Sequence, residues 1–203
     1  MTTNVEEQEL KDRLSLIETM IAEGRQSTES WGWTFVLWGV AYYVAIAWAN
    51  WGHSNFAWPV TMIATSILTW VVASRMGDKQ PETTVGRAIG AIWIGVGCSM
   101  FLLFMSAGIS GRMDQQTFIA VVAAMLGSAN AASGVLLRWK AQFACALVWW
   151  TTAVLSCFGT PNQSAILGLV AIFLCQIVFG SYMMFSEFRE RKAQGRKSGA
   201  LHA

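Results

Sequence analysis

The stretch SAILGLVAIFLCQIVFGSYMMFSEFRERKAQGRK, residues 164–197, decides the fold class. Its first 22 residues contain no Asp, Glu, Lys, Arg or His. At 1.5 Å per residue, a helix of that length crosses a hydrocarbon core of about 30 Å. The remaining twelve residues carry five bases against two acids. A basic segment directly after such a span is typical of the cytoplasmic side of a membrane.

Five further apolar stretches of similar length precede this one. The six predicted spans are residues 31–49, 56–74, 88–109, 117–137, 141–158 and 164–185. Backbone polar groups in lipid must be satisfied within their own segment, so each span is predicted to be a helix. The sequence therefore predicts an all-α, polytopic membrane protein whose transmembrane domain, residues 31–186, is a six-helix bundle. Because the connections are short, consecutive helices are expected to be antiparallel neighbours.

The positions of the positive charges orient this bundle. Of the fourteen Lys and Arg residues, only Arg112 falls on the first, third or fifth connection between the spans. The other thirteen lie on the two tails and on the connections between spans two and three and between spans four and five. Cytoplasmic loops are rich in Lys and Arg. The sequence therefore predicts that both termini are cytoplasmic and that the protein lies in the cytoplasmic (inner) membrane.

The two tails have opposite charge. Residues 1–30 form a predicted acidic cytoplasmic segment with seven acids and three bases, and residues 187–203 form a basic cytoplasmic tail. The part after Lys192 is rich in Gly, Ser and charged residues and is expected to be disordered.

The acidic segment contains a short amphipathic helix, predicted over residues 5–24 with Gly24 as its stop. Four apolar residues recur at offsets of four, three and four, and we call them the stripe: Leu10, Leu14, Ile17 and Ile21. An acidic helix is repelled by an anionic membrane surface. We expect the stripe to dock instead on the basic loops or tail, on another copy of the chain or on a different protein. The alternative is that the helix only closes the bundle from below.

The spans as drawn contain no ionisable side chain of Asp, Glu, Lys, Arg or His. Proton-coupled transporters, voltage sensors and intramembrane hydrolases need such groups at depth, so the sequence argues against these classes. The four cysteines have no metal-ligand spacing, and no phosphate loop or nucleophile elbow is present. We expect no metal, no cofactor and no enzymatic activity. The basic tail lacks interleaved aromatic residues, and no nucleic-acid partner is expected.

Four polar side chains inside the spans are candidate bundle or ligand contacts. Asn130 and Gln176 each lie on a helix face with small residues, where helices approach closely and hydrogen-bond. They either stabilise packing or frame one polar pocket. Tyr42 and Tyr43 lie near the middle of the first span, where a phenol needs a partner. The aromatic face that includes Tyr42 is either a packed seam or a groove for a flat lipid, quinone or pigment.

Two further patterns leave alternatives open. Small residues at spacings of four, such as Gly86 with Gly90 and Ala123 with Gly127, allow close packing within the bundle or dimerisation. The spans also form three successive hairpins of similar length, which is consistent with a duplicated hairpin although no residue pattern repeats.

The lead-in Leu16-Ile17-Glu18-Thr19-Met20, continuing to Ser30-Trp31-Gly32 and followed by six spans, resembles a group of small, uncharacterised bacterial membrane proteins. The resemblance is one of layout. It implies a bacterial cytoplasmic membrane, and it carries no activity and no catalytic residue.

Together these observations predict a non-enzymatic integral membrane interaction or accessory protein, such as a subunit, scaffold or regulator. Its partners would be the lipid bilayer and a protein partner or second copy, bound through the N-terminal helix or through the small-residue faces. The alternative is a permease or binder for a small neutral or lipid-like molecule. That site would be centred on Asn130, Gln176 and the aromatics of the first span.

Overall fold

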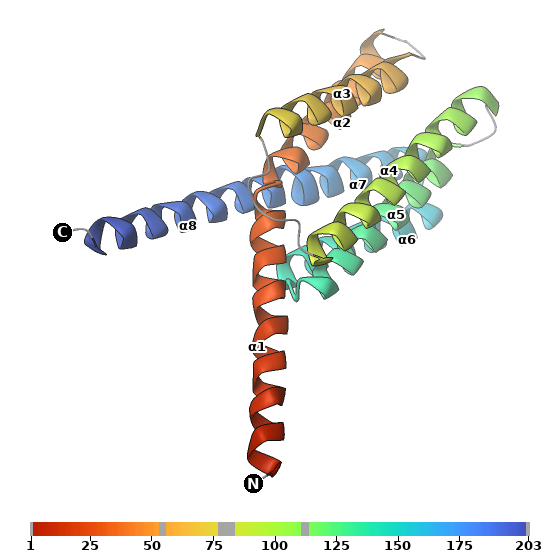
Figure 1. The fold of residues 1–203 in the computed structure, drawn as a ribbon. Helices are drawn as coiled ribbons and strands as arrows, with labels where there is room; N and C mark the ends of the chain where they lie inside the picture. Colours follow the sequence, from red (N-terminus) through yellow and green to blue (C-terminus); the bar gives the residue numbers. More distant parts are fainter. Residues whose placement is uncertain (1, 53–55, 77–83, 111–113, 202–203) are drawn as a thin grey trace.

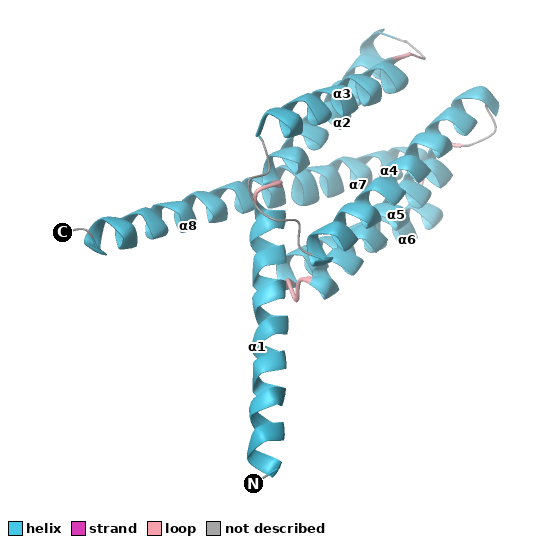
Figure 2. Cartoon of the chain, viewed as in Figure 1, coloured by secondary structure: helices cyan, strands magenta, loops and turns pink. Residues whose placement is uncertain are grey.

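The computed structural model describes residues 2–52, 56–76, 84–110 and 114–201. All regular structure in these residues is helical (Figures 1 and 2). One N-terminal helix is followed by six long apolar helices that fit membrane spans. The helices are α1 (Thr2–Glu29), α2 (Gly32–Gly52), α3 (Ala57–Met76), α4 (Thr84–Ser110), α5 (Gln115–Leu136), α6 (Lys140–Phe158), α7 (Pro161–Ile172), η1 (Phe173–Val178) and α8 (Phe179–Leu201). The predicted fold class is confirmed.

The last span is one continuous helical rod made of α7, η1 and α8 (Figure 1). Helix α2 packs against α3 and against the η1 and α8 part of the rod. Helices α5 and α6, which form the most extensive pair, pack against α7, and α4 packs against α5. The rod therefore connects the α2–α3 hairpin to the group formed by α4, α5 and α6.

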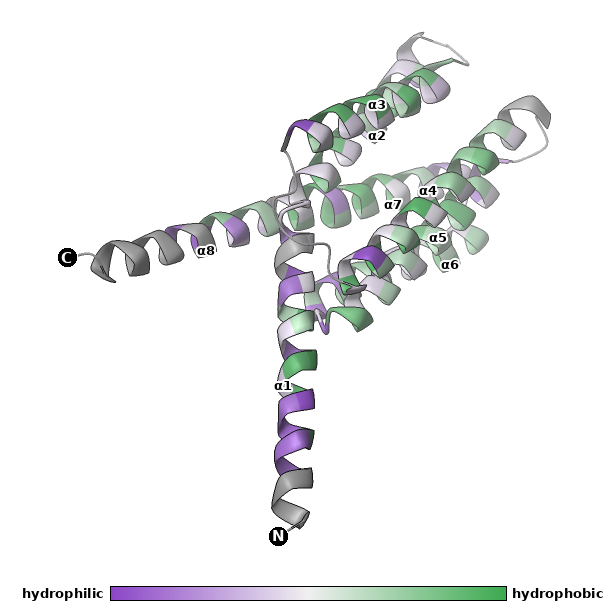
Figure 3. Ribbon diagram, in the orientation of Figure 1, coloured by the Kyte–Doolittle hydropathy of each residue, from purple (hydrophilic) through white to green (hydrophobic). Residues whose placement is uncertain are grey.

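The outer faces of the spans are apolar. Large side chains such as Ile67, Trp70, Ile94, Leu102 and Phe173 are exposed on three different elements. Figure 3 shows hydrophobic residues along the spans and the strongly hydrophilic ones near the helix ends and on α1. A face of this kind would be unfavourable in water. The six apolar helices are in contact with a lipid bilayer.

The turn between α5 and α6 is tight and specific. The Trp139 N–H donates to the Gly134 carbonyl at 2.8 Å, and the Arg138 N–H donates to the Val135 carbonyl at 3.1 Å. These are the two hydrogen bonds of a Schellman motif, in which the residue just after the C-cap adopts the left-handed conformation. Arg138 has a φ of 49°. The turn sends α6 back along α5 immediately.

Helix α5 begins with Asp114 as its N-cap. The Asp114 carboxylate accepts hydrogen bonds from the Thr117 backbone N–H at 3.0 Å and from the Thr117 hydroxyl at 2.7 Å. Both bonds favour the charged carboxylate and lower the pKa of Asp114 below its ordinary value of 3.8. Helix α7 begins with a capping box between Thr160 and Gln163, with Pro161 in its first turn. Both features stabilise the start of α7 directly after the connection from α6.

The connections lie at two opposite ends of the bundle. At one end, the last turns of α1 lie against the start of α4 and the turn between α5 and α6, through Val85 and Leu137. At the other end, the Gln116 side-chain amide donates to the Gly159 carbonyl, which brings the start of α5 to the connection between α6 and α7. The cation-rich connection at Arg138 and the N-terminal helix therefore share one end.

Two sequence-based boundaries are wrong. Helix α1 does not stop at Gly24 but continues to Glu29, because this glycine is used for close packing rather than for a turn. Helix α8 continues past Lys192 to Leu201 where disorder was expected. No proline interrupts residues 179–201, and Glu, Arg, Lys and Gln have good helix propensity.

Candidate functional site

The base of α1 is fixed to the bundle. A Cβ built at Gly24 would lie 2.9 Å from Val85 Cγ1, so the two helices touch with no room for a side chain. Arg25 Nε lies 3.1 Å from Glu29 Oε1, and the Glu29 side chain is only 2% exposed. The Arg25 guanidinium also lies 5.0 Å from the centre of the Trp139 ring. These contacts hold the last two turns of α1 against α4 and the α5–α6 turn.

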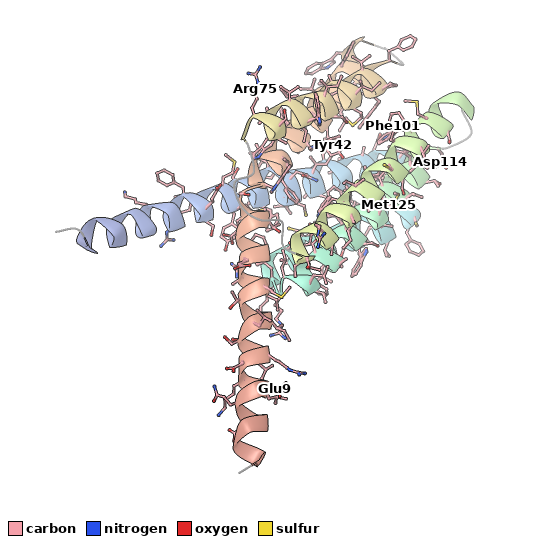
Figure 4. All side chains as sticks on the ribbon, in the orientation of Figure 1. Glu9, Tyr42, Arg75, Phe101, Asp114 and Met125 are labelled. Carbon is pink, nitrogen blue, oxygen red and sulfur yellow. The ribbon has the colours of Figure 1, made fainter. Side chains whose placement is uncertain are left out.

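The rest of α1 extends away from the bundle (Figure 1). Every residue from 7 to 19 is exposed, and Figure 4 shows Glu9 on this projecting part, well away from Tyr42 in the bundle. The stripe residues Leu10, Leu14 and Ile17 are 63%, 54% and 49% exposed. Ile21 is half-buried at the edge of the base. The stripe is therefore uncovered over most of its length.

Ion pairs on the sides of α1 stabilise the projecting part as a helix. Lys11 Nζ lies 2.7 Å from Glu7 Oε1, and an Arg13 guanidinium nitrogen lies 2.5 Å from Glu9 Oε1. Both pairs have the favourable order, with the acid four residues before the base. Between the charged sides, the stripe residues Leu10, Leu14 and Ile17 remain exposed in the part of the chain that the structure describes.

The two tyrosines of α2 occupy different environments. The Tyr43 hydroxyl donates to the Leu169 carbonyl of α7 at 2.8 Å. Tyr42 is buried among rings, with centroid distances of 6.1 Å to Trp38 and 6.4 Å to Trp58. The same ring cluster continues from α3 to α4 and α5, where Trp58 lies 5.5 Å from Phe104. These contacts favour the packed seam over a groove for a flat ligand.

The two candidate amides lie on different elements and do not hydrogen-bond each other. Asn130 is fully buried in α5, and its Nδ2 donates to the Leu126 carbonyl at 2.9 Å within the same helix. Gln176 lies in η1 and packs against α2, where a Cβ at Gly39 would be 2.8 Å from Gln176 Cβ. The small-residue faces predicted around both amides are used for close helix contacts.

The sequence analysis missed a line of polar residues on α6. Gln142, Trp149 and Ser156 recur every seven residues, so they lie on one helix face, and all three are buried. Within the described residues, both polar atoms of the Gln142 amide, Trp149 Nε1 and Ser156 Oγ have no hydrogen-bond partner, and neither has Asn130 Oδ1. The seven-residue spacing was the available signal. It was overlooked because Gln142 lies close to the end of its span.

The π-helical segment η1 was also missed. It contains Gln176 and the buried Cys175, whose thiol donates to the Cys145 carbonyl of α6 at 3.6 Å. Segments of this kind inside α-helices are frequent at functional sites. No proline or glycine cluster marks this segment in the sequence, and in the structure it contacts both α2 and α6.

Other chemistry is sparse in the described residues. No group of three or more His, Cys, Asp or Glu is placed to hold a metal ion in this part of the chain. His53, the only His residue between the two tails, and Arg112, the only cation on the first, third and fifth connections, lie outside the described residues.

Comparison of the chain with protein-family models, with curated proteins and with solved structures gives no match. The layout resemblance noted from the sequence is therefore supported only in its coarse part, the six membrane-spanning helices.

Proposed function

We propose that this protein is a non-enzymatic membrane accessory protein that holds a helical docking surface at the cytoplasmic side of the bilayer. The observation that carries the proposal is the contrast within α1. Its base is fixed by Gly24 and by the pair of Arg25 and Glu29, whereas residues 7–19 are exposed and present an apolar stripe. A helix that only closed the bundle would not need this projecting part.

The side of the membrane follows from charge. The base of α1 lies at the end of the bundle that carries Arg138 and Lys140, and the basic tail follows the last span. Connections rich in Lys and Arg remain in the cytoplasm. We infer that α1 and the basic tail both face the cytoplasm, as the cation distribution predicts. A location in a bacterial inner membrane is consistent with the same distribution of Lys and Arg.

A stripe of this kind favours a protein partner over lipid. The segment 1–30 is acidic, so an anionic membrane surface repels it, and an apolar stripe on a helix is a common element of helix recognition. The partner would cover Leu10, Leu14 and Ile17, which are the stripe residues left open.

The test is a pair of variants with equal added charge. In the stripe variant, Leu10, Leu14 and Ile17 are each changed to Glu. In the control variant, Gln8, Ser15 and Thr19, which are exposed on the other faces of the helix, are each changed to Glu. The proteins are purified from membranes in lipid nanodiscs, and native mass spectrometry identifies every protein and copy retained.

The wild type and the control variant are expected to retain the partner, and the stripe variant to lose it, with equal membrane insertion in all three. Loss of the partner in both variants would show that charge alone disrupts binding. A stripe variant with a destabilised bundle and no change in bound protein would support closure of the bundle instead.

A second candidate function rests on the buried polar atoms. The unpartnered amide atoms of Gln142 and Asn130 could hydrogen-bond a small neutral molecule inside the bundle, since buried polar groups normally have partners. This is the permease or binder alternative, moved from Gln176 towards α5 and α6. It predicts a substrate-dependent phenotype that is lost in Asn130→Ala and in Gln142→Leu but kept in the stripe variant.

A further inference from the structure

The stripe is part of a longer heptad pattern that runs into the base of α1. Apolar or small residues recur at offsets of four, three, four, three and four: Leu10, Leu14, Ile17, Ile21, Gly24 and Thr28. Alternating offsets of three and four are the pattern of a helix that packs along one seam against another helix. Gly24 and Thr28 are buried against the bundle, and Leu10, Leu14 and Ile17 are exposed. An established interface therefore continues directly into an uncovered surface.

Resting on the proposed function, we infer that the occupant of this surface is the α1 helix of a second copy of the chain, packed antiparallel. In an antiparallel pair, positions of the two alternating kinds face each other. One register matches all four stripe residues. Leu14 faces the partner's Ile17, and Leu10 faces the partner's Ile21, and two-fold symmetry repeats both contacts. Every layer of this seam is aliphatic.

The charges beside the seam select the same register. Lys11 and Glu18 occupy the equivalent flanking position in successive heptads. In the antiparallel register, Lys11 lies beside the partner's Glu18, and the symmetric pair forms on the other side. Within the described residues, Lys11 pairs only with Glu7, and Glu18 makes no ion pair. Charge complementarity of this kind fixes orientation and register.

The base of α1 excludes the parallel arrangement. Parallel helices in register would place the partner's residues 24–28 beside residues 24–28 of the first copy, on the face where Val85 and Leu137 already lie. The two bundles would then occupy the same space. In the antiparallel arrangement only the first turns of the partner's α1, residues 3–7, lie beside residues 24–28, and they must turn aside from Val85. The second bundle lies at the far end of the helix pair.

The direction of α1 fits the symmetry of two copies in one membrane. Helix α1 runs across the direction of the α7–α8 rod rather than along it (Figure 1). A two-fold axis along the membrane normal makes helices that lie across that normal antiparallel. The seam is only about three turns long, so it is weak in isolation. Confinement of both copies to one bilayer raises their effective concentration.

The first test uses charge reversal in nanodiscs that hold two copies. Lys11→Glu and Glu18→Lys each place like charges side by side twice in the dimer and are expected to weaken dimerisation about tenfold or more. The double variant restores opposite charges and is expected to dimerise about as well as the wild type. Asp12→Lys, on the outward face, is the control and should leave the dimer unchanged.

The second test uses engineered cysteines to read the direction. A copy with Leu10→Cys and a copy with Ile21→Cys should form a disulfide on mild oxidation with diamide. Two Leu10→Cys copies should not, since these residues would lie about 16 Å apart along the axis. The four native cysteines remain in place, and the wild type under the same oxidant supplies the background.

The outcomes separate this inference from the proposed function. A disulfide between two Leu10→Cys copies overturns the antiparallel pair. A single copy of the chain that retains a different protein through the stripe overturns the inference and leaves the proposed function intact. A chain that retains neither a copy nor a partner, with the stripe variant unchanged, overturns both.

Discussion

Helix α4 leaves three of its glycines facing open space, whereas α5 uses two of its glycines to pack against α6. Among the described residues, no atom lies within 4 Å of a Cβ built at Gly90, Gly95 or Gly97. In α5, a Cβ at Gly134 would lie 2.8 Å from the backbone nitrogen of Phe143, and one at Gly127 would collide with the Trp150 ring. The two helices are adjacent in the chain and both carry small residues at helical spacing.

The difference shows that small residues on one face allow a neighbouring helix to approach closely, but they do not determine whether a neighbour packs there. The decision comes from the connection. The turn at Arg138 returns α6 along α5 at once, so the glycine face of α5 is covered. Helix α4 is joined to α5 through residues 111–113 and contacts it through larger side chains such as Trp93 and Phe104.

The largest effect is expected from Gly134→Ala. The new methyl group would meet the backbone of α6, which cannot move aside as a flexible side chain can, so the helices must separate. We expect the free energy of unfolding to fall by about 2–3 kcal/mol. Circular dichroism during unfolding in mixed micelles measures it.

Gly95→Ala is the matched control for that variant, because it makes the same change on the open face of α4. It is expected to be neutral or to stabilise by up to about 1 kcal/mol, since Ala is the better helix former. Equal destabilisation by both variants would mean that the open face of α4 is covered in the folded protein.

Gln142→Met is expected to increase the free energy of unfolding, by less than Gly134→Ala lowers it. Both polar atoms of this buried amide lack partners in the described residues, so its burial costs free energy that an apolar side chain of similar length would not. The free energy of unfolding of the variant should be about 1–2 kcal/mol higher than that of the wild type, measured in the same micelles. A loss of stability would instead indicate that the amide is satisfied by a bound molecule, which favours the second candidate function.

Ser133→Ala tests the polar link between α4 and α5. The Trp93 indole N–H donates to the Ser133 hydroxyl at 3.2 Å, and the variant leaves this half-buried donor without its acceptor. A loss of about 1 kcal/mol is expected. Ser128→Ala on the same helix is the control, because its hydroxyl bonds only to the Ala124 carbonyl of its own helix. If both variants lose the same amount of stability, the hydrogen bond to Trp93 does not stabilise the packing of α4 on α5.

The smallest effect concerns the start of α5 and depends on pH. The folded-state pKa of Asp114 is lowered by its bonds to Thr117, so the stabilisation is fully present above the ordinary value of 3.8. It is lost as the pH falls through the lower folded value. Melting temperatures of wild type and Asp114→Asn, recorded from pH 6 down to acid, should converge below about pH 4. Parallel curves over the whole range would contradict this.

Much of the fold could be predicted from the sequence, because its signals are local. Six apolar runs of sufficient length gave six helices, and the offsets of Leu10, Leu14 and Ile17 predicted an amphipathic helix. The predicted helix boundaries were wrong where the same residue type can serve two structural purposes. Gly24 could end a helix or admit a neighbour, and only Val85 shows which applies.

The candidate site was less predictable, because its parts come from distant segments. The sequence placed Asn130 and Gln176 inside the spans, and both are buried, but it could not show that Asn130 bonds within α5 while Gln176 packs against α2. The partner of the Tyr43 hydroxyl is 126 residues away. The polar line on α6 was visible as a spacing of seven, and it became a candidate only once its burial was known.

The sequence by itself determined that the chain crosses a bilayer six times, that its tails carry opposite charge and that its first helix has an apolar stripe. Hydropathy, charge and periodicity are properties of each segment alone, and the bilayer acts on each segment directly. Only the tertiary structure decided which small-residue faces are covered, where the last helix becomes π-helical, and that the stripe is left open beyond its fixed base. Those outcomes depend on which segments meet, and that is set by turns and by packing between residues far apart in the chain.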